Sequence, residues 1–493
     1  MTVERFETAA EGNVNAMDAI GTHSARAREG GAARRRYASA VMSRHGASAL
    51  KTRPMLSVVV SLSALLAAAA HANPVSSSAG GAGAPLGVPS WLSQTLLPDH
   101  TNSIDEFGTS VAIEGTIAMV GSPLYPQDQG GNGGQGVVYV YAYADGAWTE
   151  TQQLAPANLT PGAAFGSVIA IRGTTAVIAA PTQNVDPYTL QGAVYVYALA
   201  DGQWSEVQEL TKTNGGPYDS YFGESIAFDG STIVIGETLA GPNTGEPPGG
   251  GAYVFTLVGG QWTQTAALSA SDGMDMDAFG RAVAVAGDTI LIASPEAHWD
   301  ANGAGPGSVH TFERSGDTWT ETGLLQSDTP VPGEYFGEIL AMESTVAIIG
   351  APGAEVNGFQ YAGAAYVFAR DGGAWTQQQR IVSADAEFFA AFGRSVAIKG
   401  DKLAIGAAGA TVADVPYAGA AYLYDVGGTL LQKFTSDAPL SGDYFGWSVD
   451  LSADGSQFLS GVPHAYDDGS GNPGSVFAFT NADVIFASGF EQP

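Results

Sequence analysis

The chain has 493 residues, no cysteine and a formal net charge of −30. That length exceeds one ordinary compact core and is typical of several domains or one large repeat array. The lack of cysteine excludes disulfides, thiolate metal sites and cysteine nucleophiles. The acidic balance argues against nucleic acid or an anionic membrane as a partner and favours cations or basic partners, although solubility outside the cell would explain it equally well.

Residues 1–72 are predicted to be an N-terminal extension that ends in a secretory signal peptide. An apolar region at 55–70 follows Arg44, Lys51 and Arg53 and runs into an Ala-His-Ala cleavage pattern at 70–72. Its length of about 15 residues falls short of the ~20 that a spanning helix needs, so export is favoured over a membrane anchor. We expect a bacterial protein that is secreted, at the cell surface or in the periplasm, without stable membrane insertion after cleavage.

Removal of residues 1–72 makes the net charge of the remaining chain more negative. This segment holds nine of the 19 basic and five of the 49 acidic residues, which leaves 10 basic and 44 acidic residues and a net charge of −34. A flexible linker is predicted over 73–89, and a strand, "WLSQTLL", over 91–97. We expect a monomer.

The dipeptide Phe-Gly then recurs seven times, at spacings of 58, 57, 57, 57, 56 and 53 residues. The copies begin at Phe107, Phe165, Phe222, Phe279, Phe336, Phe392 and Phe445. Each is followed by two short apolar runs, such as "SVAI" and "TIAMVG", then by a Gly-rich loop, a run such as "GVVYVY" and a Trp-led run such as "WTETQQL". Short runs rich in Val, Ile, Tyr and Phe and bounded by Gly indicate four strands per copy. The predicted domain spans 90–480.

Two repeat architectures compete, a closed β-propeller and an open solenoid. The seventh copy lacks a Trp-led fourth strand, and "WLSQTLL" supplies one ahead of the first copy, with Trp91 and Leu97 matching Trp148 and Leu154. A displaced strand closes a ring but has no use in a solenoid. The prediction is an all-β fold, a seven-bladed propeller of four-stranded antiparallel blades that is closed by residues 91–97.

The spacing from Phe336-Gly337 to Gly350-Ala351-Pro352 resembles the FG-GAP repeat. The chain is similar over about 90–479 to the N-terminal propeller of integrin α-subunits and to secreted bacterial FG-GAP proteins. This resemblance implies a propeller used in adhesion or ligand binding. Many members carry a D-x-D-x-D-G calcium loop between the first and second strands, whereas this chain has minimal turns there, such as Glu114-Gly115 and Asp229-Gly230. Such turns supply too few oxygen ligands for calcium, so no cofactor is expected from them.

The seven phenylalanines are interpreted as structural repeat markers wedged between blades, because burial of each ring contributes roughly 1.5–3 kcal/mol. The glycine after each is expected to allow close backbone approach or a positive φ. The tryptophans of the fourth strands are interpreted as packing residues, with Leu430 as the substitute in the sixth copy.

Connection lengths locate the candidate binding residues. Tight hairpins join strands one to two and three to four, whereas long, acidic loops join two to three and four to one and emerge together on the other face. The candidate binding residues on that face are Asp105, Glu106, Asp300, Asn302, Asp467 and Asp468. The last four lie in the nearest approaches to cation loops, so calcium is an alternative to plain solvated turns there.

No catalytic motif is found. The chain from residue 73 has four histidines, none in an H-E-x-x-H pattern, and neither a nucleophile elbow nor a phosphate-binding loop. We expect an exported, non-catalytic propeller that binds a protein or carbohydrate through its acidic loop face. The alternatives are a hydrolase acting at the centre of that face and a passive surface-coat protein. Residues 481–493 are predicted to be a C-terminal tail outside the blades.

Overall fold

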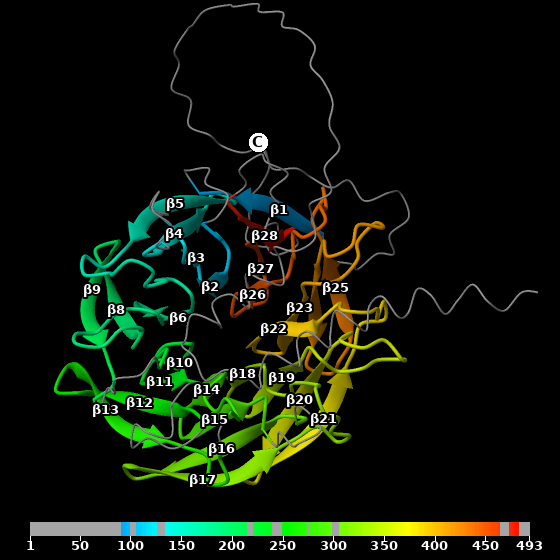
Figure 1. The fold of residues 1–493 in the computed structure, drawn as a ribbon. Helices are drawn as coiled ribbons and strands as arrows, with labels where there is room; N and C mark the ends of the chain where they lie inside the picture. Colours follow the sequence, from blue (N-terminus) through cyan, green and yellow to red (C-terminus); the bar gives the residue numbers. More distant parts are fainter. Residues whose placement is uncertain are drawn as a thin grey trace, which may run out of the picture. The chain divides into compact units, whose positions relative to one another are not determined.

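The computed structural model describes residues 90–98, 105–125, 134–213, 220–238, 249–274, 276–297, 305–463 and 473–482. Every element in these ranges is a β-strand, and the 28 strands form seven four-stranded sheets. The sheets stand around a common axis as the blades of a propeller (Figure 1). The predicted fold class is confirmed, whereas the predicted signal peptide, linker and most of the tail lie outside the described residues.

The blades follow one another in chain order. Blade 1 comprises β2 (Ser110–Glu114), β3 (Ile117–Ser122), β4 (Val137–Ala144) and β5 (Ala147–Leu154), and blade 2 comprises β6 (Ile169–Arg172), β7 (Thr175–Ala180), β8 (Ala193–Ala200) and β9 (Gln203–Leu210). Blade 3 comprises β10 (Ser225–Phe228), β11 (Thr232–Glu237), β12 (Gly251–Val258) and β13 (Gln261–Leu268). Blade 4 comprises β14 (Val283–Ala286), β15 (Thr289–Ser294), β16 (Ser308–Ser315) and β17 (Thr318–Leu325). Blade 5 comprises β18 (Ile339–Glu343), β19 (Val346–Ala351), β20 (Ala364–Asp371) and β21 (Ala374–Ile381), and blade 6 comprises β22 (Phe392–Lys399), β23 (Lys402–Ala407), β24 (Ala420–Asp425) and β25 (Leu430–Phe434). Blade 7 comprises β26 (Ser448–Leu451), β27 (Gln457–Val462), β28 (Ser475–Asn481) and β1 (Trp91–Leu96).

The ring closes between the two ends of the described chain. Strand β1 pairs antiparallel with β28, from Trp91 opposite Asn481 to Leu96 opposite Val476, and completes blade 7 (Figure 1). The predicted closure is confirmed, but the predicted match of Leu97 to Leu154 is wrong. Leu96 is the buried counterpart of Leu154, and Leu97 is 49% exposed. The cause is a β-bulge between Trp148 and Leu154 in β5, which β1 lacks.

Each Phe-Gly joins a blade to the one before it. The seven phenylalanine rings are almost fully buried, and each meets the first aromatic ring of its own third strand at a centroid distance of 5.2 to 5.7 Å. Each phenylalanine N–H also donates a hydrogen bond of 2.7 to 3.0 Å to a carbonyl at the start of the third strand in the preceding blade. The burial of the rings and these bonds support the interpretation of Phe-Gly as an inter-blade wedge.

Glycines make this close approach possible. The glycine after each phenylalanine has a φ between 85° and 98°, which confirms the predicted left-handed backbone. A second glycine, which opens each third strand, also has a positive φ and lies directly against the phenylalanine backbone of the next blade. At Gly363, for example, an added Cβ would overlap the backbone N and O of Phe392.

A glutamine clamp joins neighbouring outer strands. The side-chain amide of Gln152 in blade 1 donates to the carbonyl of Trp204 in blade 2 at 2.7 Å, and its oxygen accepts the N–H of the same residue at 2.9 Å. Gln208 and Gln94 make the same pair of bonds to Trp262 and Trp148. The packing role of the tryptophans is supported by the burial of Trp148 and Trp204.

The predicted replacement of tryptophan by Leu430 in the sixth copy is wrong. Leu430 pairs with Tyr424 and is 46% exposed, in the position that Glu150 holds opposite Tyr141 in blade 1. The register places Gly428 at the tryptophan position, where a side chain would overlap the amide of Gln379.

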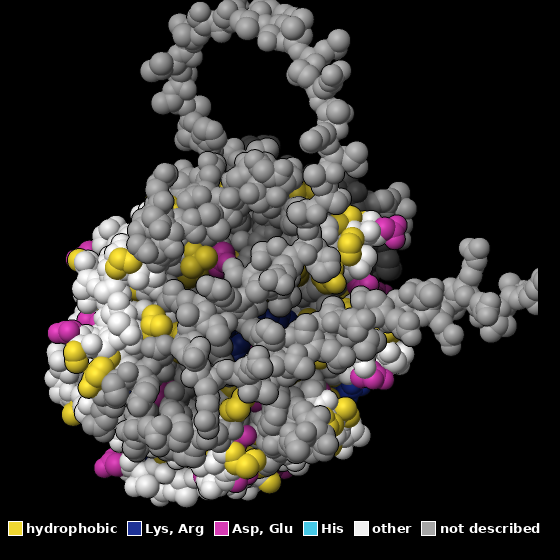
Figure 2. All heavy atoms as spheres, in the orientation of Figure 1, with side chains coloured by type: hydrophobic (Ala, Val, Ile, Leu, Met, Phe, Trp, Pro, Cys, Tyr) yellow, Lys and Arg dark blue, Asp and Glu magenta, His cyan; other side chains and the backbone are white. Residues whose placement is uncertain are grey.

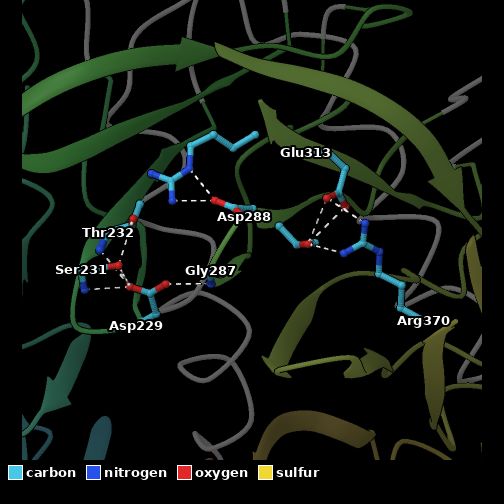
Figure 3. A network of polar contacts seen from close by, with 9 residues as sticks. Asp229, Ser231, Thr232, Gly287, Asp288, Glu313 and Arg370 are labelled. Atoms are coloured by element: carbon cyan, nitrogen blue, oxygen red, sulfur yellow. Dashed lines mark hydrogen bonds and ion pairs between the residues drawn. The ribbon is translucent and has the colours of Figure 1, made fainter. Parts of the chain in front are cut away.

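Polar contacts bind the blades together on the face of the tight hairpins (Figure 3). Asp229 of blade 3 accepts the N–H of Gly287 in the first hairpin of blade 4 at 2.9 Å. Glu114 and Glu343 make the same contact with the next blade, at 3.1 and 2.6 Å. Arg370 of blade 5 reaches Glu313 of blade 4 at 2.8 Å. The short first hairpins thus hold acids that join blades to one another.

Candidate functional site

All long connections emerge on one side of the ring, which we call the long-loop face. In blade 1 the first and third hairpins are the two-residue turns 115–116 and 145–146, whereas 123–136 joins β3 to β4 and 155–168 joins β5 to β6. The other blades repeat this division. Loops on a rigid scaffold are where binding groups gather, so the candidate site is sought on this face.

The two residues before each phenylalanine lie at the base of the long-loop face and have the same backbone conformation and burial in every blade. The residue directly before it has a φ between 53° and 59° in all seven blades. The residue one position earlier is buried throughout: Asp105, Ala163, Ser220, Asp277, Glu334, Ala390 and Asp443. Two of these residues close their own loops, because Asp277 and Asp443 each accept the backbone N–H three residues earlier at 2.8 Å.

The sequence-predicted binding residues fall into two groups. Asp105 is completely buried, and its carbonyl accepts a hydrogen bond from the Ser122 hydroxyl at 2.8 Å. Glu106 is half-buried at the long-loop face, where burial raises its pKa to about 7. Asp300, Asn302, Asp467 and Asp468 lie outside the described residues.

A ring of side chains surrounds the axis where the inner strands begin on the long-loop face. These are the residues that directly follow each Phe-Gly, and we call them the axial ring. In blade order they are Thr109, Ser167, Glu224, Arg281, Glu338, Arg394 and Trp447. Arg281 lies between two carboxylates, with nitrogen to oxygen distances of 3.1 Å to Glu224 and 2.6 Å to Glu338.

These contacts set the protonation of the axial ring. Although burial alone would raise the pKa of Glu338, Arg281 and Arg394 together hold that pKa below its ordinary value. The Glu338 carboxylate in turn raises the pKa of Arg281. Burial lowers the pKa of Arg394, Glu338 opposes that shift, and the proximity of Arg281 adds to it. The axial ring therefore holds one arginine, Arg281, that is shared by two carboxylates, with a second arginine nearby.

Arg394 and Trp447 are neighbours in the axial ring and form a cation–π pair. The guanidinium carbon lies 4.6 Å from the centre of the indole ring. Tyr444, the residue before the seventh Phe-Gly, meets the indole edge-on at 6.2 Å. An arginine and two aromatic rings thus lie together between blades 6 and 7.

Further aromatic side chains extend from this point over the loops of blades 5 to 7. Tyr361 stacks on Phe389 at 5.5 Å, and Phe359 meets Phe388 edge-on at 5.1 Å. Phe388 is 54% exposed and Tyr417 is 42% exposed. We call Phe359, Tyr361, Phe388, Phe389, Tyr417, Tyr444 and Trp447 the aromatic patch. Exposed aromatic rings gathered on one loop surface are a feature of binding surfaces.

The other end of the axis holds a cavity of about 170 Å³ lined by all seven inner strands. Asp450 stands here where the other six blades have alanine, and its carboxylate accepts the N–H groups of Ile113 and Leu451 at 2.9 Å. Burial raises the pKa of Asp450, and Lys399 opposes that shift. Asp450 therefore ties blade 7 to blade 1 at the closure of the ring.

Charge is unevenly distributed across the disc. Figure 2 shows Lys and Arg both near its centre and at its rim, whereas most visible Asp and Glu lie toward the rim. The inner strands and the residues that lead into them carry four of the ten basic residues found after position 72: Arg172, Arg281, Arg394 and Lys399. An acidic protein thus concentrates basic groups around its axis.

The sequence reasoning missed the axial ring and the aromatic patch. The axial ring has a sequence signal, because it always occupies the position after Phe-Gly and alternates Glu, Arg, Glu, Arg from blade 3 to blade 6. The sequence signal of the aromatic patch is weaker, since its members come from four separate segments of the chain.

Among residues with described positions, no group of three or more His, Asp or Glu side chains is arranged to hold a metal ion. In the same part of the chain, no helix has the length and apolar character needed to cross a membrane.

A model of the FG-GAP repeat matches residues 92–141, 148–197, 204–255, 262–312, 319–368 and 375–424, more than half of the chain. No curated protein matches the sequence. A solved structure of a putative 6-phosphogluconolactonase from Bacteroides fragilis is similar over 70% of this chain and 87% of that chain, with 14% identity and a TM-score of 0.44. A likeness this distant supports no statement about activity.

Proposed function

The chain belongs to the FG-GAP repeat family, and from this premise we propose that it is an exported, non-catalytic propeller that binds a protein or glycan through its long-loop face. The aromatic patch carries this proposal. Its rings come from the loops of three blades, and Phe388 and Tyr417 are 54% and 42% exposed.

Aromatic rings suit both classes of ligand. They give a large contact area at low cost in conformational entropy, and they dominate the binding energy of protein interfaces. Their faces also stack against the apolar C–H faces of sugars. The net charge of −30 disfavours nucleic acid as a ligand and opposes self-association, so we propose that the protein acts as a monomer.

The test is binding of the full chain to immobilised glycans and to surface proteins, with a paired variant. We expect Phe388→Ala with Tyr417→Ala to weaken binding by about tenfold or more, because each ring contributes on the order of 1 kcal/mol or more at a binding surface. The matched control is Leu257→Ala with Val258→Ala. These side chains are 57% and 54% exposed but lie at the hairpin between β12 and β13, on the opposite face.

Equal loss of binding in both double variants, or none in either, would contradict a site at the aromatic patch. The non-catalytic part of the proposal is tested separately with chromogenic glycosides and esters. Turnover by the purified protein that survives a change of expression host would refute it.

A further inference from the structure

Resting on the proposed function, we propose that the axial ring is an anion-binding site in which Arg394 binds a carboxylate group. The carboxylate is carried either by a free small acid or by an acidic sugar of a glycan. This inference adds a specific chemistry to the centre of the long-loop face, next to the aromatic patch.

The hydrogen-bonding capacity of Arg394 is the first observation behind it. A guanidinium has five N–H donors, and within the described ranges no oxygen accepts any of those of Arg394. Its only described side-chain contact is the face of Trp447, which fixes the plane of the guanidinium without using a donor. Arg281 differs, because Glu224 and Glu338 already occupy its two terminal nitrogens. The terminal nitrogens of Arg281 are thus already paired with carboxylates, whereas the N–H donors of Arg394 have no acceptor among the described residues.

The environment of Arg394 favours an incoming anion. The side chain is half-buried at the mouth of the axis, where a charged hydrogen bond is stronger than in water. Burial also lowers the pKa of Arg394, although the nearby Glu338 carboxylate opposes that shift. A planar carboxylate matches the guanidinium fork with two parallel hydrogen bonds and restores the lost solvation.

The surroundings also limit the charge of the ligand. The proximity of Arg281 and Arg394 lowers the pKa of Glu338, which adds a carboxylate to the site. The whole chain also has a net charge of −30. A phosphate dianion or a dense polyanion would meet this negative field, whereas a single carboxylate needs only the charge of Arg394. The site is therefore assigned to a monoanion.

Aromatic neighbours favour a sugar as the carrier of that carboxylate. Tyr444 lies beside Trp447, and Tyr417 lies 6.1 Å from Tyr444 toward the exposed part of the aromatic patch. A ligand whose carboxylate reaches Arg394 would lay its ring along these side chains. A free acid such as acetate would use Arg394 alone.

The experiment is a ligand-observed NMR titration of the full chain at low salt with glucuronate, acetate and the neutral methyl glucoside. We expect glucuronate to bind and Arg394→Gln to weaken that binding by about tenfold or more, as loss of charged hydrogen bonds does. The matched control is Arg314→Gln. Arg314 also lies over a tryptophan, 5.4 Å from Trp319, but it pairs with Asp288 near the hairpin face. Its loss should change the dissociation constant by less than about twofold.

The comparison ligands and a second variant separate the remaining alternatives. Tighter binding of glucuronate than of acetate supports an acidic sugar, and equal binding supports a free acid. Arg394→Lys keeps the charge without the planar fork and should bind with intermediate affinity, which tests the site even if Arg394→Gln folds poorly. Unchanged glucuronate binding in Arg394→Gln, or equal binding of methyl glucoside by the unaltered protein, would overturn the inference.

The carboxylate site and the proposed function can each fail without the other. If the Phe388 and Tyr417 double variant loses a macromolecular ligand while Arg394→Gln keeps it, only the carboxylate site fails. If the unaltered protein binds glucuronate but no glycan or protein, the proposed function fails instead.

Discussion

The glycine that opens each third strand is the residue with the least freedom to change. Gly363 has a φ of 88° and lies directly against the backbone of Phe392 in the next blade. Gly358, five residues earlier in the same loop, has a nearly equal φ of 86° but open space around the position of a Cβ. The two positions separate the cost of backbone strain from the cost of steric overlap.

Gly358→Ala is expected to cost about 1–2 kcal/mol, the penalty of a left-handed conformation with a Cβ. Gly363→Ala adds a backbone collision, and we expect a loss of at least about 3 kcal/mol because blade 5 and blade 6 must separate locally. Urea denaturation followed by circular dichroism gives both values. Equal losses would show that the contact between Gly363 and Phe392 is unimportant.

Prediction from sequence at the residue scale succeeded where a residue recurred in register. Seven copies of Phe-Gly pointed to a buried wedge, and all seven rings are buried in the structure. The role of the acidic residues in the loops could not be inferred from the sequence in the same way. Asp277 and Asp443 bind backbone groups of their own loops, and only the loop conformation reveals this.

At the scale of the strand, the glutamine clamp is the feature that sets one blade against the next. Gln208 of β9 both donates to and accepts from the backbone of Trp262 in β13, at 2.7 and 2.9 Å. The clamp requires the glutamine four residues after tryptophan in the bulged strands β5 and β9, but three residues after Trp91 in the unbulged β1. This change of spacing explains why the pattern is hard to see in the sequence.

Gln208→Ala removes two hydrogen bonds and leaves two backbone groups of Trp262 without that partner. We expect a loss of about 1–3 kcal/mol in the free energy of unfolding. Gln261→Ala is the control, because Gln261 is exposed at the start of β13 and its side chain makes no inter-blade bond among the described residues. If both variants are equally stable, the clamp contributes nothing measurable.

The same bulge accounts for what the sequence could not predict about strands. Strand number and type followed from runs of Val, Ile, Tyr and Phe, because such runs fit a pleated surface. Register within the outer strands did not follow, since one inserted residue moves every later side chain. Leu97 was misassigned for this reason, because β1 lacks the bulge that β5 contains.

For the whole molecule, β1 is the element on which closure depends. Six residues of β1 pair with β28, Trp91 meets Phe434 of blade 6 edge-on at 5.1 Å, and Gln94 clamps Trp148 of blade 1. One short strand thus contacts three blades. The sequence predicted this closure because the missing strand of the last copy appears at the other end of the repeat.

Deletion of residues 90–97 is expected to cost at least about 5 kcal/mol, from lost strand pairing and the burial of Trp91 and Leu96. The melting temperature from circular dichroism should fall accordingly. Addition of a peptide spanning 90–98 should restore much of it, whereas a scrambled peptide should not. An unchanged melting temperature after deletion would show that the ring does not need this strand.

The pairing of β1 with β28 also determines how the propeller responds to mechanical force. Ser90 and Ala482 are joined by a hydrogen bond of 2.7 Å, so the two ends of the ring leave it at the same point. A pull on both ends would open the antiparallel pair from Trp91 and Asn481 onward, one bond after another, as a zipper opens. A pull between one end and a ligand on the long-loop face would instead be shared by the inter-blade contacts. Attachment through one end only is thus the arrangement in which this ring best withstands tension.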